Sequence, residues 1–193
     1  MNTADKYSAL PPLREVINEY GLRAEKSLGQ NFILDQNITD KIVRHAGNVR
    51  QCHVIEIGPG PGGLTRSILR YDPLHLTAIE YDDRAIKALQ SLVQASDKKL
   101  TLLQDDALRT DVTQVAPNVE RMIIANLPYN IATTLLIGWL RQIRNDPQVF
   151  TSMTLMFQKE VAERIVASSR TKAYGRLSVM SQWLCDVNIM FDL

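Results

Sequence analysis

The tetrapeptide Asn126-Leu127-Pro128-Tyr129 combines residue types that could bind a flat heterocycle carrying an exocyclic amine. The amide can accept a hydrogen bond from the amine, and the aromatic ring can stack on the heterocycle. Pro128 lacks an N–H and biases Leu127 toward an extended backbone, which we expect to leave carbonyls available to a ligand. The preceding apolar run, residues 122–125, predicts a buried strand that delivers Asn126 to the carboxyl edge of a sheet. The alternative is a strand-ending turn with Tyr129 buried in the core.

From Cys52 onward, short apolar runs alternate with longer amphipathic stretches. This alternation indicates βαβ units and therefore an α/β protein whose parallel sheet is covered by helices on both faces. The predicted strands are residues 53–57, 76–79, 100–103, 122–125, 153–157 and a last one at 187–191. The predicted helices are residues 64–70, 84–95, 131–143, 158–167 and 177–184.

A glycine loop follows the first of these strands. Gly58, Gly60 and Gly63 satisfy the pattern Gly-x-Gly-x-x-Gly, and Glu80 ends the next predicted strand. Glycines let the backbone approach a ligand closely, and the helix N-terminus that follows favours anionic groups. A carboxylate at the end of the second strand can accept hydrogen bonds from both ribose hydroxyls. The pattern fits a dinucleotide or S-adenosylmethionine equally well, and a plain strand–helix turn is the third interpretation.

The third predicted strand is followed by Asp105, Asp106 and Ala107. Asp106 could accept a hydrogen bond from an adenine amino group, and Ala107 could offer its backbone N–H. A helix cap at Asp106 is equally consistent with the local sequence.

Two helices and a loop are predicted ahead of the alternating region. Residues 11–21 begin with proline, carry one apolar face and end in glycine, which is typical of a short helix. A second helix is predicted from about Gln36 to Ala46, with Asp35 as its cap and Gly47 closing it. We therefore divide the chain into an N-terminal helical segment with a cofactor-lid loop, residues 1–50, and a core, residues 51–193.

Length and composition limit the class of protein. At 193 residues, with 45% hydrophobic and 22% charged residues, the chain is long enough for one well-cored domain. No apolar run approaches the ~18 residues of a membrane span, and the N-terminus lacks a signal-peptide core. The cysteines and histidines show no disulfide or metal-ligand spacing, so we expect a cytoplasmic protein without a metal.

The net charge of +1 produces no global field that would attract a nucleic acid. Residues 157–176 are nevertheless locally basic, and their cationic side chains are Lys159, Arg164, Arg170, Lys172 and Arg176. Such a run is either a solvated face or a contact for an RNA backbone.

Taken together, these segments resemble the ribosomal RNA adenine N6-dimethyltransferases, most closely the branch that acts on small-subunit rRNA. The segments that carry the resemblance are Gly29-Gln30-Asn31-Phe32, Glu56-Ile57-Gly58-Pro59-Gly60, Glu80, Asp106-Ala107, Asn126-Leu127-Pro128-Tyr129-Asn130, Gln158-Lys159-Glu160 and Lys172-Ala173-Tyr174-Gly175-Arg176-Leu177-Ser178-Val179. The Gly-Pro-Gly loop and the Lys-Ala-Tyr-Gly-Arg-Leu segment separate this branch from the related resistance enzymes that act on large-subunit rRNA.

The resemblance implies a Rossmann-like class I methyltransferase fold that binds S-adenosylmethionine. Gly58 would lie against the methionine part of the cofactor, Glu80 would bind the ribose, and Asp106 would meet the adenine. Ile33 replaces the family's usual leucine, a swap of similar volume from which we expect little consequence. The residues implied in cofactor binding are Asn31, Ile33, Gly58, Gly60, Glu80, Asp106, Ala107 and Asn126.

The implied reaction is methyl transfer to N6 of two adjacent adenosines near the 3′ end of small-subunit rRNA, within an immature subunit and by a monomer. In our hypothesis, the Asn126 oxygen and a carbonyl of Leu127 or Pro128 accept the two N–H bonds of the amine, and Tyr129 stacks on the flipped base. Nitrogen becomes acidic as the methyl transfers, so no strong base is needed and positioning with electrostatics would carry the catalysis. The basic run would contact the RNA backbone.

Two other functions stay open. A nicotinamide-dependent oxidoreductase could use the same glycine loop, but it leaves residues 126–129 without a role. A non-enzymatic ribosome-assembly or transcription factor could be built on the same scaffold, although the intact Glu80, Asp106 and Asn126 favour an active site.

The family's pattern continues into a Phe-x-Pro-x-Pro-Lys-Val loop, a last strand and a small helical domain, none of which is present in this sequence. We therefore expect residues 187–193 to lack a neighbouring strand. We also expect the chain to bind S-adenosylmethionine but to methylate subunits poorly.

Overall fold

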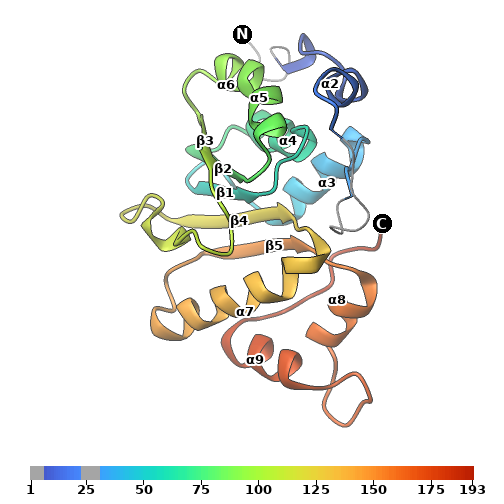
Figure 1. Ribbon diagram of the computed structural model, residues 1–193. Helices are drawn as coiled ribbons and strands as arrows, with labels where there is room; N and C mark the ends of the chain where they lie inside the picture. The colour runs from blue at the N-terminus through green and yellow to red at the C-terminus, as the bar shows by residue number, and fades with distance from the viewer. Residues whose placement is uncertain (1–6, 23–30) are drawn as a thin grey trace.

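A single parallel sheet organises the computed structural model, which describes residues 7–22 and 31–193. Its strand order is β3-β2-β1-β4-β5, and all neighbouring strands are parallel (Figure 1). The strands are β1 (His53–Ile57), β2 (His75–Glu80), β3 (Leu100–Gln104), β4 (Arg121–Asn126) and β5 (Ser152–Met156). The predicted α/β class is confirmed, and each of these strands falls within one residue of its predicted position.

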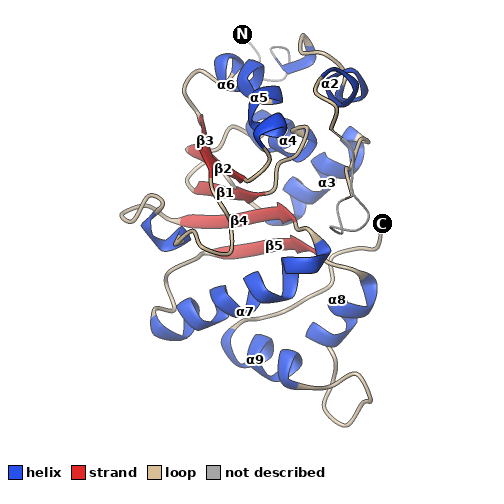
Figure 2. Cartoon of the chain, in the orientation of Figure 1, coloured by secondary structure: helices blue, strands red, loops and turns tan. Residues whose placement is uncertain are grey.

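Helices connect the strands and cover both faces of the sheet (Figure 2). In the described residues they are α2 (Leu13–Glu19), α3 (Gln36–Ala46), α4 (Gly63–Arg70), α5 (Asp83–Ala88), α6 (Gln90–Ala95), α7 (Tyr129–Asn145), α8 (Lys159–Ile165) and α9 (Arg176–Leu184). Within the described residues, none of the helices has the length and apolar character needed to cross a membrane.

The sequence signals at the ends of α3 act as predicted. Asp35 Oδ1 accepts a hydrogen bond of 2.8 Å from the N–H of Asn37, which caps the helix. At the other end Gly47 adopts a φ of 94°, a conformation that glycine reaches without steric cost. Ile42 and Val43 are buried against the sheet, so α3 belongs to the same core as β1 and α4. The division of the chain at residue 50 stays a prediction.

Successive residues of the central strands face opposite sides of the sheet. Val54 packs in the cluster that contains α3 and α4, whereas Ile55 packs in the cluster that contains α7. Ile124 and Ile123 divide in the same way on β4, and all four side chains have no exposed surface. A shift of one residue would move every side chain of a strand to the opposite cluster and disrupt the packing of both, so the register of the strand ends is fixed.

The strand order reverses between β1 and β4. The chain proceeds from β1 to β2 and β3 on one side, then returns to place β4 and β5 on the other. In open α/β sheets ligands bind beyond the carboxyl ends of the strands at this reversal. Gly58 follows β1 and Leu127 follows β4, so the fold brings the glycine loop and the Asn126 motif next to each other.

The helix predicted over residues 84–95 is divided into α5 and α6. Leu89 separates the two, with a side chain that is 1% exposed. Its Cδ2 atom would lie only 2.6 Å from a Cβ placed on Gly62, so Leu89 packs tightly on the glycine loop. Helical periodicity alone does not reveal this break, because both pieces keep the same buried face.

The strand predicted at residues 187–191 is wrong. Val187 packs in the α7 cluster and Phe191 in the α3 cluster, so the segment crosses the end of the sheet instead of following its edge. The ring of Phe191 lies 5.1 Å from the ring of His45, and Lys41 Nζ is 3.9 Å from its centre. The alternating apolar residues predicted a strand, but side-chain contacts on two different faces determine the path.

Candidate functional site

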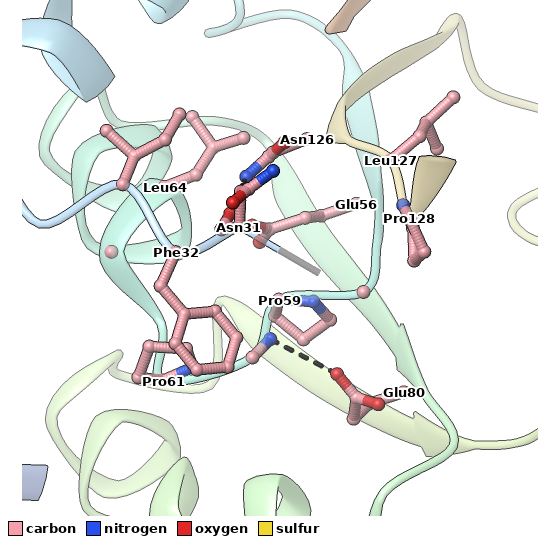
Figure 3. Close-up of a pocket in the computed structure, with 14 residues that line it drawn as sticks. Asn31, Phe32, Glu56, Pro59, Pro61, Leu64, Glu80, Asn126, Leu127 and Pro128 are labelled. Atoms are coloured by element: carbon pink, nitrogen blue, oxygen red, sulfur yellow. Dashed lines mark hydrogen bonds between the residues drawn. The ribbon is translucent and has the colours of Figure 1, made fainter. Parts of the chain in front are cut away.

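A cavity of about 60 Å³ lies at the carboxyl ends of β1, β2 and β4 (Figure 3). The residues predicted for the site that line it are Asn31, Ile33, Gly58, Gly60, Glu80, Asn126, Leu127 and Pro128. The lining does not include Asp106, Ala107 or Tyr129. Gly29 and Gln30 of the resemblance lie outside the described residues.

Two glycines of the loop have positive φ angles, and only the second of them leaves no room for a Cβ. Gly58 has φ of 65°, and a Cβ there would lie 3.6 Å from Cδ of Pro128. Gly60 has φ of 54°, and a Cβ there would lie 2.8 Å from Cε1 of Phe32. The loop is therefore in contact with the β4 motif on one side and with the N-terminal segment on the other.

The carboxylate of Glu80 holds the glycine loop in place. Oε2 accepts a hydrogen bond of 3.1 Å from the N–H of Gly60, as Figure 3 shows. Oε1 accepts from the N–H groups of Tyr81 at 2.8 Å and Asp82 at 2.9 Å. Each carboxylate oxygen has more than one lone-pair direction, so the group can accept further donors from the cavity. Glu80 is thus both a cavity wall and the anchor of the loop.

Glu56 is a buried acid just before the glycine loop, and no role was predicted for it from the sequence. Its side chain is 1% exposed and lines the cavity, and Oε2 has no hydrogen-bond partner in the described parts of the chain. Its pKa is raised from 4.5 to about 8, chiefly by burial; the Thr65 hydroxyl lowers this pKa and the nearby Glu80 raises it. Such an orphaned oxygen fits a ligand that brings a donor group.

Asn126 is bonded to the N-terminal segment across the cavity. Its Nδ2 donates a hydrogen bond of 2.6 Å to the main-chain carbonyl of Asn31. The amide is thereby oriented with Nδ2 toward that segment, which leaves Oδ1 as the atom that can accept a hydrogen bond.

The two carbonyls proposed to be available to a ligand are not equivalent. The carbonyl of Pro128 accepts hydrogen bonds from the N–H groups of Ile131 at 3.1 Å and Ala132 at 3.0 Å, because Pro128 is the N-cap of α7. The start of that helix therefore uses both of its lone pairs. This reduces the hypothesis to the carbonyl of Leu127.

Residues 31–33 close the cavity. The Phe32 ring lies on Gly60, and the main-chain oxygen of Ile33 would be 2.7 Å from a Cβ on Gly63. Small-molecule pockets usually measure about 300–1,000 Å³, far more than the space present. A ligand the size of S-adenosylmethionine therefore requires this segment to move away from the loop.

Asp106 caps the turn that follows β3, which was the alternative to a contact with adenine. Its Oδ1 accepts a hydrogen bond of 2.9 Å from the N–H of Leu108, and its carbonyl accepts from Arg109 and Thr110. These bonds form a single turn after β3. Contact between Asp106 and an adenine stays a prediction, as does stacking on Tyr129, which is half-buried at the start of α7.

The cationic side chains predicted to bind RNA are exposed on α8, α9 and the loop between them. Lys159 forms an ion pair of 2.9 Å with Asp192, so its charge is partly neutralised within the chain. The other members of this set are Arg164, Arg170, Lys172 and Arg176.

Phe32 and Leu64 also line the cavity, and the sequence interpretation assigned no role to either. A signal existed for Glu56, which is an acidic residue inside an otherwise apolar strand. Phe32 could be recognised as part of the resemblance, but its contact with Gly60 depends on tertiary structure. Among the described residues no three His, Cys, Asp or Glu side chains come together as a metal site.

Comparison with known proteins identifies the family. The profile described as "Ribosomal RNA adenine dimethylase" matches residues 21–192. The chain belongs to the ribosomal RNA adenine dimethylase family. It is 51% identical over 184 residues to "Ribosomal RNA small subunit methyltransferase A" of Bradyrhizobium sp. strain BTAi1, and 52% identical over 185 residues to the protein of that name from Paracoccus denitrificans. These matches cover 95% of this chain and 64% of each relative.

Solved structures of two dimethylase-like enzymes share the fold. A dimethyladenosine transferase from Plasmodium falciparum superposes with a TM-score of 0.64 at 30% identity, over 77% of this chain and 50% of that one. The 23S rRNA methyltransferase ErmE gives a TM-score of 0.59 at 25% identity, over 78% and 55%. The predicted Rossmann-like methyltransferase fold is thereby confirmed.

Proposed function

We propose that this chain binds S-adenosylmethionine and transfers its methyl group to the N6 atoms of two adjacent adenosines near the 3′ end of small-subunit rRNA. The observation that carries the proposal is one cavity that joins the glycine loop, Glu80 and the Asn126 motif at the reversal of strand order. The names of the relatives, which refer to small-subunit rRNA methylation, support it. The chain spans 64% of their length.

The residues of the cavity fit the cofactor. The unpartnered Oε2 of Glu56 suits a donor group, and the carboxylate of Glu80 at the end of β2 suits ribose hydroxyls. Gly58 and Gly60 allow close approach of the main chain. When bound, S-adenosylmethionine supplies an electrophilic methyl group on sulfonium. Asn31, Ile33 and Asn126 would complete the binding site after the segment moves.

Asn126 and Leu127 would act on the acceptor. Asn126 Oδ1 and the carbonyl of Leu127 each accept one N–H bond of the adenine amine, which favours a pyramidal nitrogen and aims its lone pair at the methyl group. Tyr129 stacks on the flipped base. Positioning of this kind supplies roughly 7–11 kcal/mol when the geometry is tight, so a strong general base is not needed.

We further propose that the substrate is rRNA in an immature small subunit, contacted by the basic residues of α8 and α9, and that the protein works as a cytoplasmic monomer. A methyl-transfer assay with labelled S-adenosylmethionine and immature small subunits tests the reaction. Label in dimethyladenosine supports the proposal. Heat stabilisation by NAD instead of S-adenosylmethionine would favour the oxidoreductase, and binding without transfer to any RNA would favour a non-catalytic factor.

A further inference from the structure

A second, larger cavity lies on the other side of the segment that closes the first. Its volume is about 660 Å³, and its walls come from α2, the start of α3, and α4. Gly63 lines both cavities, while Ile33 lines the first and Leu34 the second. A single stretch of main chain therefore separates the two. We call the second cavity the arginine groove, because its lining includes Arg14, Arg66 and Arg70.

Arg66 is a buried guanidinium with an unused donor. Its side chain is 9% exposed, and Nη1 donates a hydrogen bond of 2.8 Å to the carbonyl of Pro11. Nε is buried and has no partner in residues 7–22 and 31–193. Burial lowers the pKa of Arg66, and the neighbouring Arg70 lowers it further. A buried charge with an unsatisfied donor is costly, so the site favours an arriving acceptor.

The carboxylates around the groove do not neutralise it. Arg70 lies 4.0 Å from Asp40, whose Oδ1 also accepts a hydrogen bond of 2.5 Å from the Ser67 hydroxyl. Among the described lining residues, Asp35 is the one carboxylate against three arginines, and its Oδ1 also caps α3. Arg14 is exposed at the rim and forms no ion pair within the described residues. The groove therefore presents an excess of positive charge.

We propose that the arginine groove binds a phosphodiester group of the RNA strand, next to the segment that closes the first cavity. Guanidinium groups match phosphate oxygens with parallel pairs of donors. The volume exceeds that of one phosphate, and Leu10 and Leu13 provide apolar walls suited to the adjoining sugar. The groove adjoins the segment that closes the first cavity, so RNA bound in the groove would lie next to the cofactor site. This inference rests on the function proposed above.

The test measures RNA binding by the chain with a labelled single-stranded RNA over a range of salt concentrations. Arg14→Ala removes an exposed cation, and Arg66→Lys keeps the charge but loses Nε and the planar donor pair. We expect each change to weaken binding roughly three- to tenfold at low salt, and Arg14→Ala to reduce the slope of log affinity against log salt by about 0.7. Arg50→Ala is the matched control, because Arg50 is exposed just before the amino end of β1, away from the carboxyl ends of the strands. It should leave the RNA affinity and the salt slope unchanged.

Thermal unfolding accompanies each measurement, because Arg66 also bonds to Pro11. Arg14 makes no such bond to the residues that the structure describes, so Arg14→Ala tests the groove even where Arg66→Lys unfolds. Unchanged RNA affinity and salt slope in a folded Arg14→Ala variant overturn the groove assignment but leave the proposed function standing. A parent chain that binds no RNA overturns both. Heat stabilisation by inorganic phosphate, together with unchanged RNA affinity in the variants, means that the groove takes a small anion and that the RNA assignment is wrong.

Discussion

The side-chain amide of Asn126 donates a hydrogen bond of 2.6 Å to the main-chain carbonyl of Asn31. This bond joins the end of β4 to the segment ahead of α3 across the cavity. It orients the amide so that Oδ1 is the atom left to accept a bond from an adenine amine. The same contact holds residues 31–33 over the glycine loop. The proposed acceptor site and the closure of the cavity are therefore linked through one side chain.

Replacement of Asn126 should separate methyl transfer from cofactor binding. Asn126→Ala removes the Oδ1 acceptor, and we expect transfer to fall by roughly two to three orders of magnitude, comparable to the loss of one electrostatic donor in other enzymes. Cofactor affinity should stay within a few fold, because the substitution removes one hydrogen bond, to Asn31, and such a bond contributes about 1 kcal/mol. Single-turnover transfer and calorimetry measure the two quantities.

Asn130→Ala is the matched control for that experiment. Asn130 lies in the same motif, but its side chain is exposed on α7 and does not line the cavity. It should transfer methyl groups at the parent rate. Equal turnover in Asn126→Ala and Asn130→Ala would contradict the role given to Asn126.

The sequence was sufficient to predict β1 to β5 and the glycine-loop wall of the cavity, because both depend on local signals. Apolar runs predicted β1 to β5, and the Gly-x-Gly-x-x-Gly pattern with Glu80 predicted the wall that Figure 3 shows. The path of residues 187–191 could not be predicted, because Val187 and Phe191 pack on different faces of the sheet. Nor could the use of the Pro128 carbonyl, which follows from the residue at which α7 begins.

Gly60 should tolerate no side chain, for two separable reasons. A Cβ would collide with the Phe32 ring at 2.8 Å, and the φ of 54° is unfavourable for any other residue. We expect Gly60→Ala to lower the free energy of unfolding by about 1–2 kcal/mol from the backbone and by about 1–3 kcal/mol from overpacking. Urea unfolding measures the total.

A double-mutant cycle with Phe32→Ala divides these two contributions. The smaller side chain relieves the collision but not the backbone strain, so Gly60→Ala should cost less in the Phe32→Ala background. Additive effects of the two substitutions would mean that the Phe32 ring moves away freely and does not close the cavity in solution.

The buried carboxyl of Glu56 should make stability decline as pH rises. Its pKa is raised from 4.5 to about 8 in the folded protein, mainly by burial. Between these values the folded state retains a proton that the unfolded state has released. The free energy of unfolding therefore falls between about pH 4.5 and about pH 8, and this contribution is constant above that range.

Glu56→Gln should remove that decline, because the amide does not titrate. Urea unfolding of parent and variant over this pH range measures the difference, and Glu15→Gln, an exposed position on α2, serves as the control. Parallel pH profiles for the parent and Glu56→Gln would show that Glu56 stays ionised in the folded protein.

Charge reversal at the start of α9 and in the loop before it should weaken RNA binding, because these side chains would no longer neutralise phosphates. Lys172 and Arg176 are exposed, and the ion pairs that the structure describes do not involve them. The double variant Lys172→Glu with Arg176→Glu should reduce the slope of log affinity against log salt. The expected reduction is about 0.7 for each phosphate of a single strand that the variant no longer neutralises. Arg144→Glu is the control, because Arg144 is exposed in the last turn of α7, near the amino ends of the strands and away from the site at their carboxyl ends. If both proteins lose affinity equally, net charge alone attracts the RNA; if neither does, these residues form a solvated face.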